Sequence, residues 1–308
     1  MELFSSNQSS LLRTIADLDG TPSGAYNIRL DGVSVKRAET DNIKIVSKTD
    51  KSGIDIYIRP FTKDENVHIP VVISKSGISE YVYNDFHIGE GADVVIVAGC
   101  GIHNDGDCES RHDGIHTFFV GKGARVVYVE KHYGDGDGTG ERVMNPSTVI
   151  YLAEGAYMEM KTQQIKGVDS TDRSTRAVLE KGATLVVTEN LMTHGKQTAI
   201  TRFTLDLNGE GSGAHVVSRS VAKDSSHQIF ESLVNGNCKC NGHTECDAIV
   251  MDDATVSAIP KINANSVEAS LIHEAAIGKI AGEQLIKLMT LGMTEEEAEN
   301  EIINGFLK

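Results

Sequence analysis

Hydrophobic and polar residues alternate along the first quarter of the chain, after a short segment of a different period. Between Ala25 and Ile73 apolar residues recur at every second position, for example at Tyr26, Ile28 and Leu30. A period of two is typical of β-strands that bury one face. Residues 9–18, which include LLRTIADL, instead have helical spacing. We therefore predict a short N-terminal helix followed by short strands joined by polar turns.

A short phrase then recurs through the middle of the chain. Its copies read IGEGADVVIV, VGKGARVVYV, LAEGAYMEM and LEKGATLVV, followed by the degenerate GEGSGAHVV and MDDATVSAI. Aligning these copies places six alanines at equivalent positions, 27 to 40 residues apart: Ala92, Ala124, Ala156, Ala183, Ala214 and Ala254. Self-similarity at such a period indicates a repeat architecture. Each unit reads as a strand, a tight Gly-Ala turn, a second strand and a polar loop.

This regularity predicts a mainly β fold, a right-handed parallel β-helix in which each coil buries its apolar face against its neighbours. The alternative is an antiparallel sandwich whose hairpins share a turn phrase. We assign residues 1–75 to an N-terminal helix and short strands, 76–272 to the β-helix core, and 273–308 to a C-terminal helical region.

The C-terminal residues change to a helical period. Leu285, Leu288 and Met289 share one helix face, and Gly292 follows as a stop signal. Thr294 and Glu297 have the spacing of a capping box. We predict two short helices, the second ending at the glycine at position 305, which cap the solenoid, dock a partner, or do both.

Charge and composition narrow the functional classes. The chain has 308 residues and a formal net charge of −15, which argues against binding nucleic-acid phosphates or an anionic membrane surface. The first ten residues, MELFSSNQSS, lack the charged and apolar regions of a signal peptide, and no apolar run is long enough to span a bilayer. The five cysteines, an odd number, fit a reducing compartment. We expect a cytoplasmic protein with neither nucleic-acid nor membrane partners.

Motifs for self-contained catalysis are missing. The sequence contains no phosphate-binding P-loop, no G-x-S-x-G elbow, and no strand-linked G-x-G-x-x-G before a helix. The chain thus has no evident means of hydrolysing a nucleotide, and we expect that it is not an enzyme.

Three groups of residues could hold a metal. The first is Cys238, Cys240 and Cys246, because residues two apart on an extended segment face the same side and thiolates favour iron–sulfur clusters, Zn²⁺ and Cu⁺. Their spacing matches neither ferredoxins nor four-ligand zinc sites, so we predict no stable closed site. The alternative is that one or more of these cysteines fill a small apolar space.

The second group lies in an expected polar loop and comprises Cys100, His103, Cys108, His112 and His116. These residues either ligate a transition metal or are simply solvated. The third group is His273 and Glu274, at the change from strands to helices. Here the alternative is that Glu274 only complements the dipole of a helix start.

The C-terminal third resembles a known family. HEAAIGKI, followed by GEQLIKLMTLGMTEEEAENEIINGF, resembles the C-terminal signature of the SufB/SufD family of iron–sulfur cluster assembly proteins. SRSVAKDSSHQIF and GHTECDAIVMDDATVSAIP resemble the preceding segments of the family. The chain is similar to the compact form found in minimal SUF systems, where one such protein replaces both subunits.

The resemblance implies a scaffold role. Members of the family form dimers through the end of the β-helix, and their C-terminal helical region binds SufC, an ABC-type ATPase that supplies nucleotide hydrolysis. The scaffold builds a transient iron–sulfur cluster and passes it to apo-protein acceptors. By resemblance, His273 and Glu274 match residues implicated in cluster formation at the dimer interface.

One departure bears on the site. A key cysteine of SufB-type members corresponds here to Ala254, as in SufD-type chains. Cys240 and Cys246 match other SufB cysteines, whereas Cys238 is additional. The predicted metal ligands are therefore Cys240, Cys246, Cys238, His273, Glu274 and Cys100.

Three functions remain open at this point. The chain is a scaffold, as a homodimer or in a SufB/SufD-like heterodimer, or it is a SufD-like structural partner of the ATPase without a cluster site. A carbohydrate-active β-helix enzyme is disfavoured because Trp is absent and no secretion signal is visible.

Overall fold

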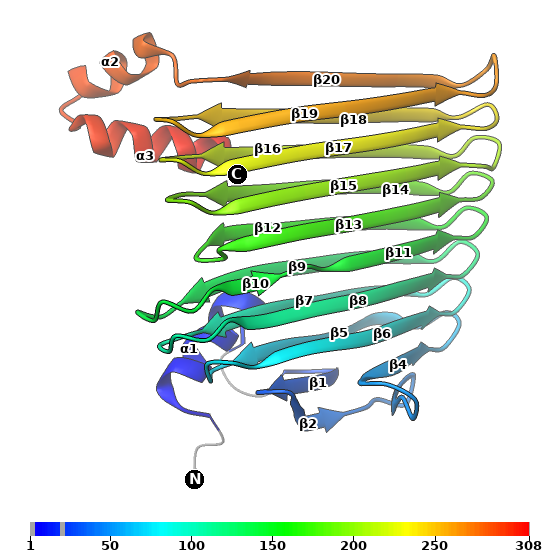
Figure 1. Cartoon of the computed structure of the whole chain (residues 1–308). Coiled ribbons are helices and arrows are strands. Elements are labelled where there is room, and N and C mark those ends of the chain that lie inside the picture. The colour runs from blue at the N-terminus through cyan, green and yellow to red at the C-terminus, as the bar shows by residue number, and fades with distance from the viewer. Residues whose placement is uncertain (1–3, 19–21, 308) are drawn as a thin grey trace.

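The structure is a computed structural model that describes residues 4–18 and 22–307. It is a flattened β-solenoid of about eight turns with three helices at its ends (Figure 1). Two sheets face each other, and each coil contributes one strand to each sheet. Sheet A runs in the order β2 (Val33–Ala38), β1 (Ala25–Leu30), β5 (Lys63–Ile73), β7 (Asp93–His103), β9 (Arg125–Asp135), β12 (Tyr157–Lys166), β14 (Thr184–Thr193), β16 (Gly213–Ala222), β18 (Asn241–Val250) and β20 (Ser270–Gly278).

Sheet B forms the opposite wall. Its order is β19 (Thr255–Ala264), β17 (His227–Gly236), β15 (Thr198–Leu207), β13 (Ser170–Leu179), β10 (Arg142–Met144), β8 (Ser110–Val120), β6 (Ser79–Ile88), β4 (Gly53–Ile58) and β3 (Ile43–Ser47). A further strand, β11 (Ser147–Leu152), also lies between β8 and β13.

Strand direction decides between the two predicted architectures. Every pair from β4 to β20 is parallel, and within the described ranges only β1–β2 and β3–β4 are antiparallel. The parallel solenoid is therefore confirmed and the sandwich is excluded. The ladder also extends beyond residues 76–272, because β4 pairs with β6 and β20 pairs with β18. His273 accordingly lies in a strand, nine residues before Gly282, where the first C-terminal helix begins.

The Gly-Ala turns stack at one end of the coils, at the right in Figure 1. Ala92, Ala124, Ala156 and Ala183 occupy the inside of successive corners, each preceded by a glycine with φ between 61° and 66°. The strand register puts Ser212, Cys240 and Ala269 at the next three corners. The predicted equivalence of Ala214 and Ala254 to these alanines is wrong. Ala214 lies two residues past the corner at Ser212, and Ala254 lies in the turn at the other end of the coils, just before β19. The alignment is wrong because serine and cysteine replace alanine at the two corners that follow Ala183.

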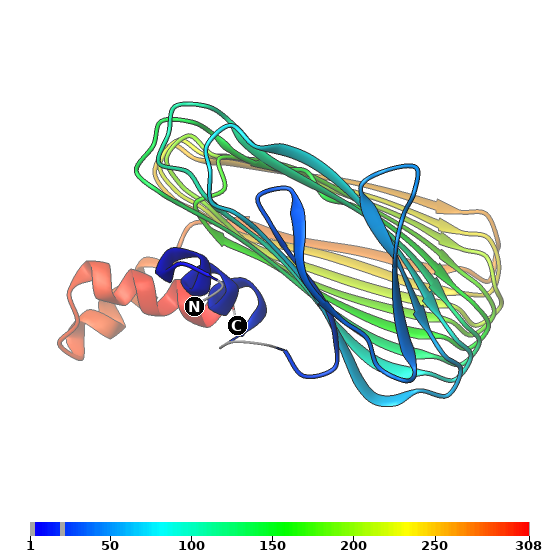
Figure 2. The same cartoon turned by 90° about the horizontal axis from the view of Figure 1, so that it is seen from below.

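The N-terminal helix, α1 (Ser6–Ala16), packs on the outer face of sheet A (Figures 1 and 2). It begins earlier than predicted because Ser5 and Gln8 form a capping box. Leu11 and Ile15 face β7, where glycine permits close approach: a Cβ at Gly99 would lie 2.3 Å from the Ile15 carbonyl oxygen.

Two helices close the chain, α2 (Gly282–Thr290) and α3 (Glu295–Phe306). The predicted capping box of Thr294 and Glu297 is present, whereas the second helix continues through the glycine at position 305. Ile303 and Leu307 anchor α3 against Val221 and Ile249 on sheet A. By contrast, α2 contains no buried residue. In the described ranges, no helix has the length and apolarity needed to cross a membrane.

Candidate functional site

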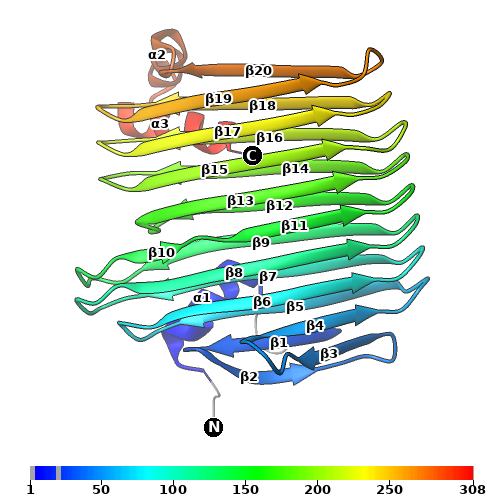
Figure 3. The same cartoon turned by 45° about the vertical axis from the view of Figure 1, so that its right-hand side comes forward.

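The C-terminal end of the solenoid is open. The strands β19 and β20 pair on one side only, with β17 and β18, and no other described strand covers their outer edges (Figure 3). Inward-facing side chains of this last coil therefore meet solvent: Ile262 is 40% exposed and Ile277 is 42% exposed. The predicted ligands of the last two coils therefore lie near a solvent-exposed end of the core.

On the inner face of sheet A, Cys246 and His273 lie near each other on adjacent strands. Cys246 of β18 is in register with Ala275, two residues beyond His273 on β20. The Nδ1 atom of His273 lies 2.8 Å from the hydroxyl of Thr244. Burial raises the pKa of the Cys246 thiol to about 12, and burial together with His243 lowers the pKa of His273. The pair therefore presents a protonated thiol and a neutral imidazole at neutral pH.

Glu274 points to the other face of the sheet, because successive side chains on a strand alternate. There it joins His243 and Glu245 of β18, and one ligand atom from each of the three lies within 4.8 Å of the others. We call these three residues the outer triad. Within it, His243 Nε2 lies 3.4 Å from Glu274 Oε2.

Two neighbours shape the outer triad. The Nδ1 atom of His243 lies 3.0 Å from Nδ1 of His215. The other ring nitrogen of His243, Nε2, is buried and makes no hydrogen bond with any described residue. Burial and a hydrogen bond with Asp247 raise the pKa of Glu245. One imidazole and two carboxylates suit a divalent transition metal such as Fe²⁺ or Mn²⁺.

The two other clustered cysteines lie elsewhere. Cys240 fills the corner position that alanine holds in earlier coils, and six residues of extended chain, roughly 20 Å, separate it from Cys246. Burial raises the pKa of Cys240, and the half-buried Cys238 directs its Sγ toward the Leu207 carbonyl, 3.5 Å away. Within one chain, this corner pair does not join Cys246.

The second predicted group is also divided. Cys100 is buried on β7, five strand steps or about 24 Å from β18. The expectation that the group lies in a loop is wrong for most of it, since Cys100 and His103 belong to β7, and His112 and His116 belong to β8. Only Cys108 lies in the connecting turn, where it is exposed.

The sequence interpretation missed a buried polar network between the sheets. Arg173 forms an ion pair with Glu130, and its Nε lies 3.6 Å from Glu189 Oε1. Glu189 accepts a hydrogen bond of 2.7 Å from Ser218, which neighbours Cys246 in register. The alternation in VVYVEKHY puts Glu130 in phase with buried apolar residues, and that signal could have revealed a buried charge.

Comparison with known proteins gives a consistent result. The family model described as "SUF system FeS cluster assembly, SufBD core domain" matches residues 72–306. An iron–sulfur cluster assembly SufBD family protein of Methanothermobacter thermautotrophicus is 30% identical over 242 residues, covering 76% of this chain and 57% of the relative. One from Archaeoglobus fulgidus is 27% identical over 278 residues, covering 89% and 73%.

A relative from Pyrococcus horikoshii, also named as a SufBD family protein, is 25% identical over 284 residues, covering 90% of this chain and 81% of its own. The chain thus spans little more than half the length of the Methanothermobacter relative but most of the Pyrococcus one. The match of the core model over most of the described chain confirms the resemblance seen in the C-terminal motifs. This protein belongs to the SufB/SufD family of iron–sulfur cluster assembly proteins.

Proposed function

We propose that this chain is a cytoplasmic scaffold subunit of a SUF-type assembly complex, which holds iron and sulfide at its open end and releases the finished cluster to apo-protein acceptors. It performs no nucleotide chemistry itself, because a SufC-type ATPase supplies the hydrolysis. One observation carries the proposal: side chains of the kinds that bind iron occupy both faces of sheet A in the two coils nearest the open end.

Two copies that meet at their open ends would cover the exposed edges of β19 and β20. Long unpaired strands such as β19 and β20 are templates for pairing with another chain. A two-fold interface is self-complementary, so each ligand from one copy is matched by the same ligand from the other. A seam at this end would bring together two copies of Cys246, His273 and Glu274.

The protonation of Cys246 suits temporary binding. A thiol with a pKa of about 12 must lose its proton to ligate iron, so binding releases a proton and the free energy of ligation is reduced accordingly. The outer triad offers Fe²⁺ imidazole and carboxylate ligands, which hold it less strongly than thiolates hold a cluster. Weak ligation at both places favours release to an acceptor.

The exposed helix α2 is the proposed docking element for the ATPase. It presents Ile286 and Met289 to solvent, and Leu291 directly after it is also exposed, whereas α3 anchors the pair to sheet A. An unpartnered apolar helix face beside a folded anchor is typical of a partner contact. Movement of the ATPase subunits would then reach the open end through β20, which leads directly into α2.

Anaerobic reconstitution with Fe²⁺ and sulfide tests the site. We expect Cys246→Ala and Glu274→Gln each to reduce the visible sulfide-to-iron charge-transfer band by more than half. Glu283→Gln, an exposed acidic residue of α2, is the matched control and should leave the band unchanged. If both site variants match the control, this end is not where the cluster forms.

A corner variant separates two forms of the proposed site. Cys240→Ala should fold normally, because alanine occupies the same corner in four earlier coils. Loss of the charge-transfer band in this variant would make the corner thiols ligands across the seam, and an unchanged band would assign Cys240 to packing.

The second candidate function is a SufD-like partner that tethers the ATPase without holding a cluster. Ala254, in the turn between β18 and β19, favours it because it replaces the thiol of SufB-type members. Under this alternative the homodimer retains no sulfide, and cluster appears only when a SufB-type chain forms a heterodimer with it.

A further inference from the structure

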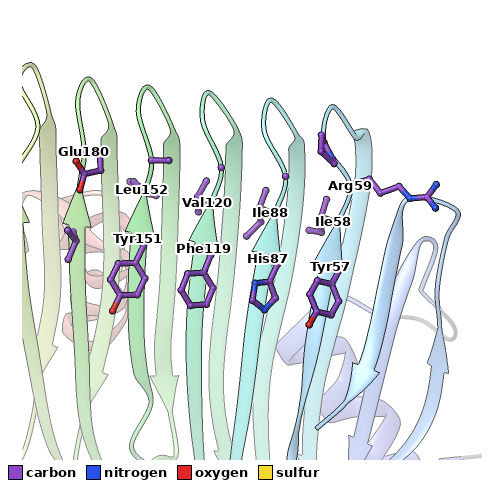
Figure 4. A pocket seen from close by; sticks show the side chains of 15 residues that line it. Tyr57, Ile58, Arg59, His87, Ile88, Phe119, Val120, Tyr151, Leu152 and Glu180 are labelled. Carbon is purple, nitrogen blue, oxygen red and sulfur yellow. The ribbon is translucent and has the colours of Figure 1, made fainter.

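Four rings form a ladder on the outer face of sheet B. Tyr57, His87, Phe119 and Tyr151 occupy the same outward position on β4, β6, β8 and β11 (Figure 4). Neighbouring rings stack with centroids 4.7, 5.1 and 5.4 Å apart and planes within 9° of parallel. We call these four residues the aromatic ladder.

A shallow groove follows the ladder along the solenoid axis. Small residues at the adjacent turns, Gly89, Gly121 and Ala153, leave a hollow of about 680 Å³ beside the rings. The groove ends at two opposite charges, Arg59 at one end and Glu180 at the other (Figure 4). Among the described residues, neither of these side chains makes a hydrogen bond or an ion pair.

Stacking of the coils does not require this apolar surface. The same outward row continues through Val178 to Asp206, Asn235 and Asn263, where side-chain hydrogen bonds of 2.7 and 2.8 Å link the coils. Amide ladders thus stabilise the later coils with polar groups. In the earlier coils the row instead leaves Tyr57, Phe119 and Tyr151 between 41% and 45% exposed. Exposed apolar patches of this kind mark interaction sites.

The stacking and spacing of the rings favour an α-helix as the bound ligand. The rings cover one another's faces, so a sugar or a base cannot stack between them and only the ring edges meet a ligand. Coils repeat at about 4.8 Å, close to the 5.4 Å pitch of an α-helix, whereas same-side residues of an extended strand repeat at about 6.8 Å. A helix along the groove therefore places one apolar residue on each ring.

Length and area favour a short segment. From the Arg59 corner to the Glu180 corner the groove crosses four coil steps, about 19 Å, which a helix of about 13 residues spans. The exposed rings offer on the order of 300 Å², well below the roughly 800 Å² per partner of a stable protein–protein interface. A helix from a partner protein fits this surface better than a second copy of the chain.

We propose that the aromatic ladder docks an amphipathic helix of about three turns from a partner protein, with an acidic residue beside Arg59 and a basic residue beside Glu180. Its apolar residues fall at positions i, i+4, i+7 and i+11 and lie on the ring edges. This site is on sheet B, away from the ligand residues of sheet A, and it does not depend on the proposed cluster chemistry.

The test uses a synthetic helix as the probe. A lactam-stapled 14-residue peptide, about 20 Å long, carries leucine at the four apolar positions, glutamate at one end and lysine at the other. Fluorescence anisotropy measures its binding to the full chain. We expect saturable binding that Phe119→Ser weakens about tenfold. Val95→Ser removes an equally exposed apolar residue from the outer face of sheet A and should change nothing.

Charge reversal tests the orientation. Arg59→Glu and Glu180→Lys should each weaken binding about threefold, because exposed pairs contribute little. The double variant should restore the affinity with the helix reversed, which a spin label at one end of the peptide reports. Absence of saturable binding, equal loss in Val95→Ser, or no recovery in the double variant would overturn the proposal. The proposal would also be overturned if Phe119→Ser changed the sedimentation mass of the free chain. That result would show that a second copy of the chain occupies the groove.

Discussion

The two ends of this solenoid are built differently, although the same coil repeats between them. At the N-terminal end β2 turns back antiparallel on β1, and β3 does the same on β4 (Figures 1 and 3). Of these two short strands, β3 buries Ile43 and Ile45 against the core. At the C-terminal end β19 and β20 are ten and nine residues long, and no described strand pairs with their outer side.

The difference indicates which end has a function beyond stability. Solenoids need a terminal element that covers the last coil, and natural proteins cover or shorten their edge strands to avoid unwanted pairing. The N-terminal end follows this rule. The C-terminal end departs from it at the place where Cys246, His273 and the outer triad lie, which is why we propose that pairing and iron binding occur at that end.

The largest expected effect comes from weakening the closed end. Ile43→Ala removes a fully buried side chain and should lower the free energy of unfolding by about 2–5 kcal/mol. Ile262→Ala at the open end should cost less than about 1 kcal/mol in the isolated chain, because that side chain is already partly in water. Urea unfolding at low protein concentration compares the two, and equal losses would contradict the distinction between the ends.

The next effect concerns pairing of the open ends. Ile262→Glu places a charge on the inward face of the last coil and should weaken dimerisation at least about thirtyfold, as burying an unpaired charge at an interface does. Sedimentation velocity measures the change. The matched control is Val95→Glu, on an outer face far from the seam, which should leave the dimer intact.

An effect that is smaller at each pH unit should appear as a dependence of the stability on alkaline pH. Burial raises the pKa of Cys246 from 9.0 to about 12, so the unfolded chain loses this proton at lower pH than the folded chain. The contribution of the protonated thiol to the free energy of unfolding is fully present below pH 9. It is lost as the pH rises from 9 to 12, by about 1.4 kcal/mol per pH unit. Cys246→Ala should make the alkaline loss shallower by that amount, as measured by urea unfolding at several pH values.

The control for this titration is Ser218→Ala, the inward neighbour of Cys246 on β16. It changes a hydrogen bond in the same row but no group that titrates in this range. An unchanged slope in Cys246→Ala, or an equal change in Ser218→Ala, would show that the buried thiol does not titrate as described.

Much of the fold could be predicted from the sequence because alternation and the Gly-Ala phrase are local signals. The alignment failed where Ser212 and Cys240 replaced the corner alanine, since the pattern then lost its only landmark. The register between coils determines which residues lie at these corners, and a single sequence does not reveal that register.

The candidate site was predictable by residue type but not by placement. Period two already implies that His273 and Glu274 point to opposite faces. The distance of Cys100 from β18 depends on counting coils, and the meeting of Glu274 with His243 and Glu245 depends on register. The link from Arg173 to Glu130 and Glu189 likewise requires three different coils to be superposed.

The most direct test is the iron and acid-labile sulfide content of Ile262→Glu after anaerobic reconstitution, measured per chain in size-separated fractions. This variant keeps every proposed ligand and loses only the seam. We predict that the wild-type dimer retains both iron and sulfide, whereas the monomeric variant retains no sulfide. A monomer that holds as much sulfide as the wild-type dimer would contradict the account.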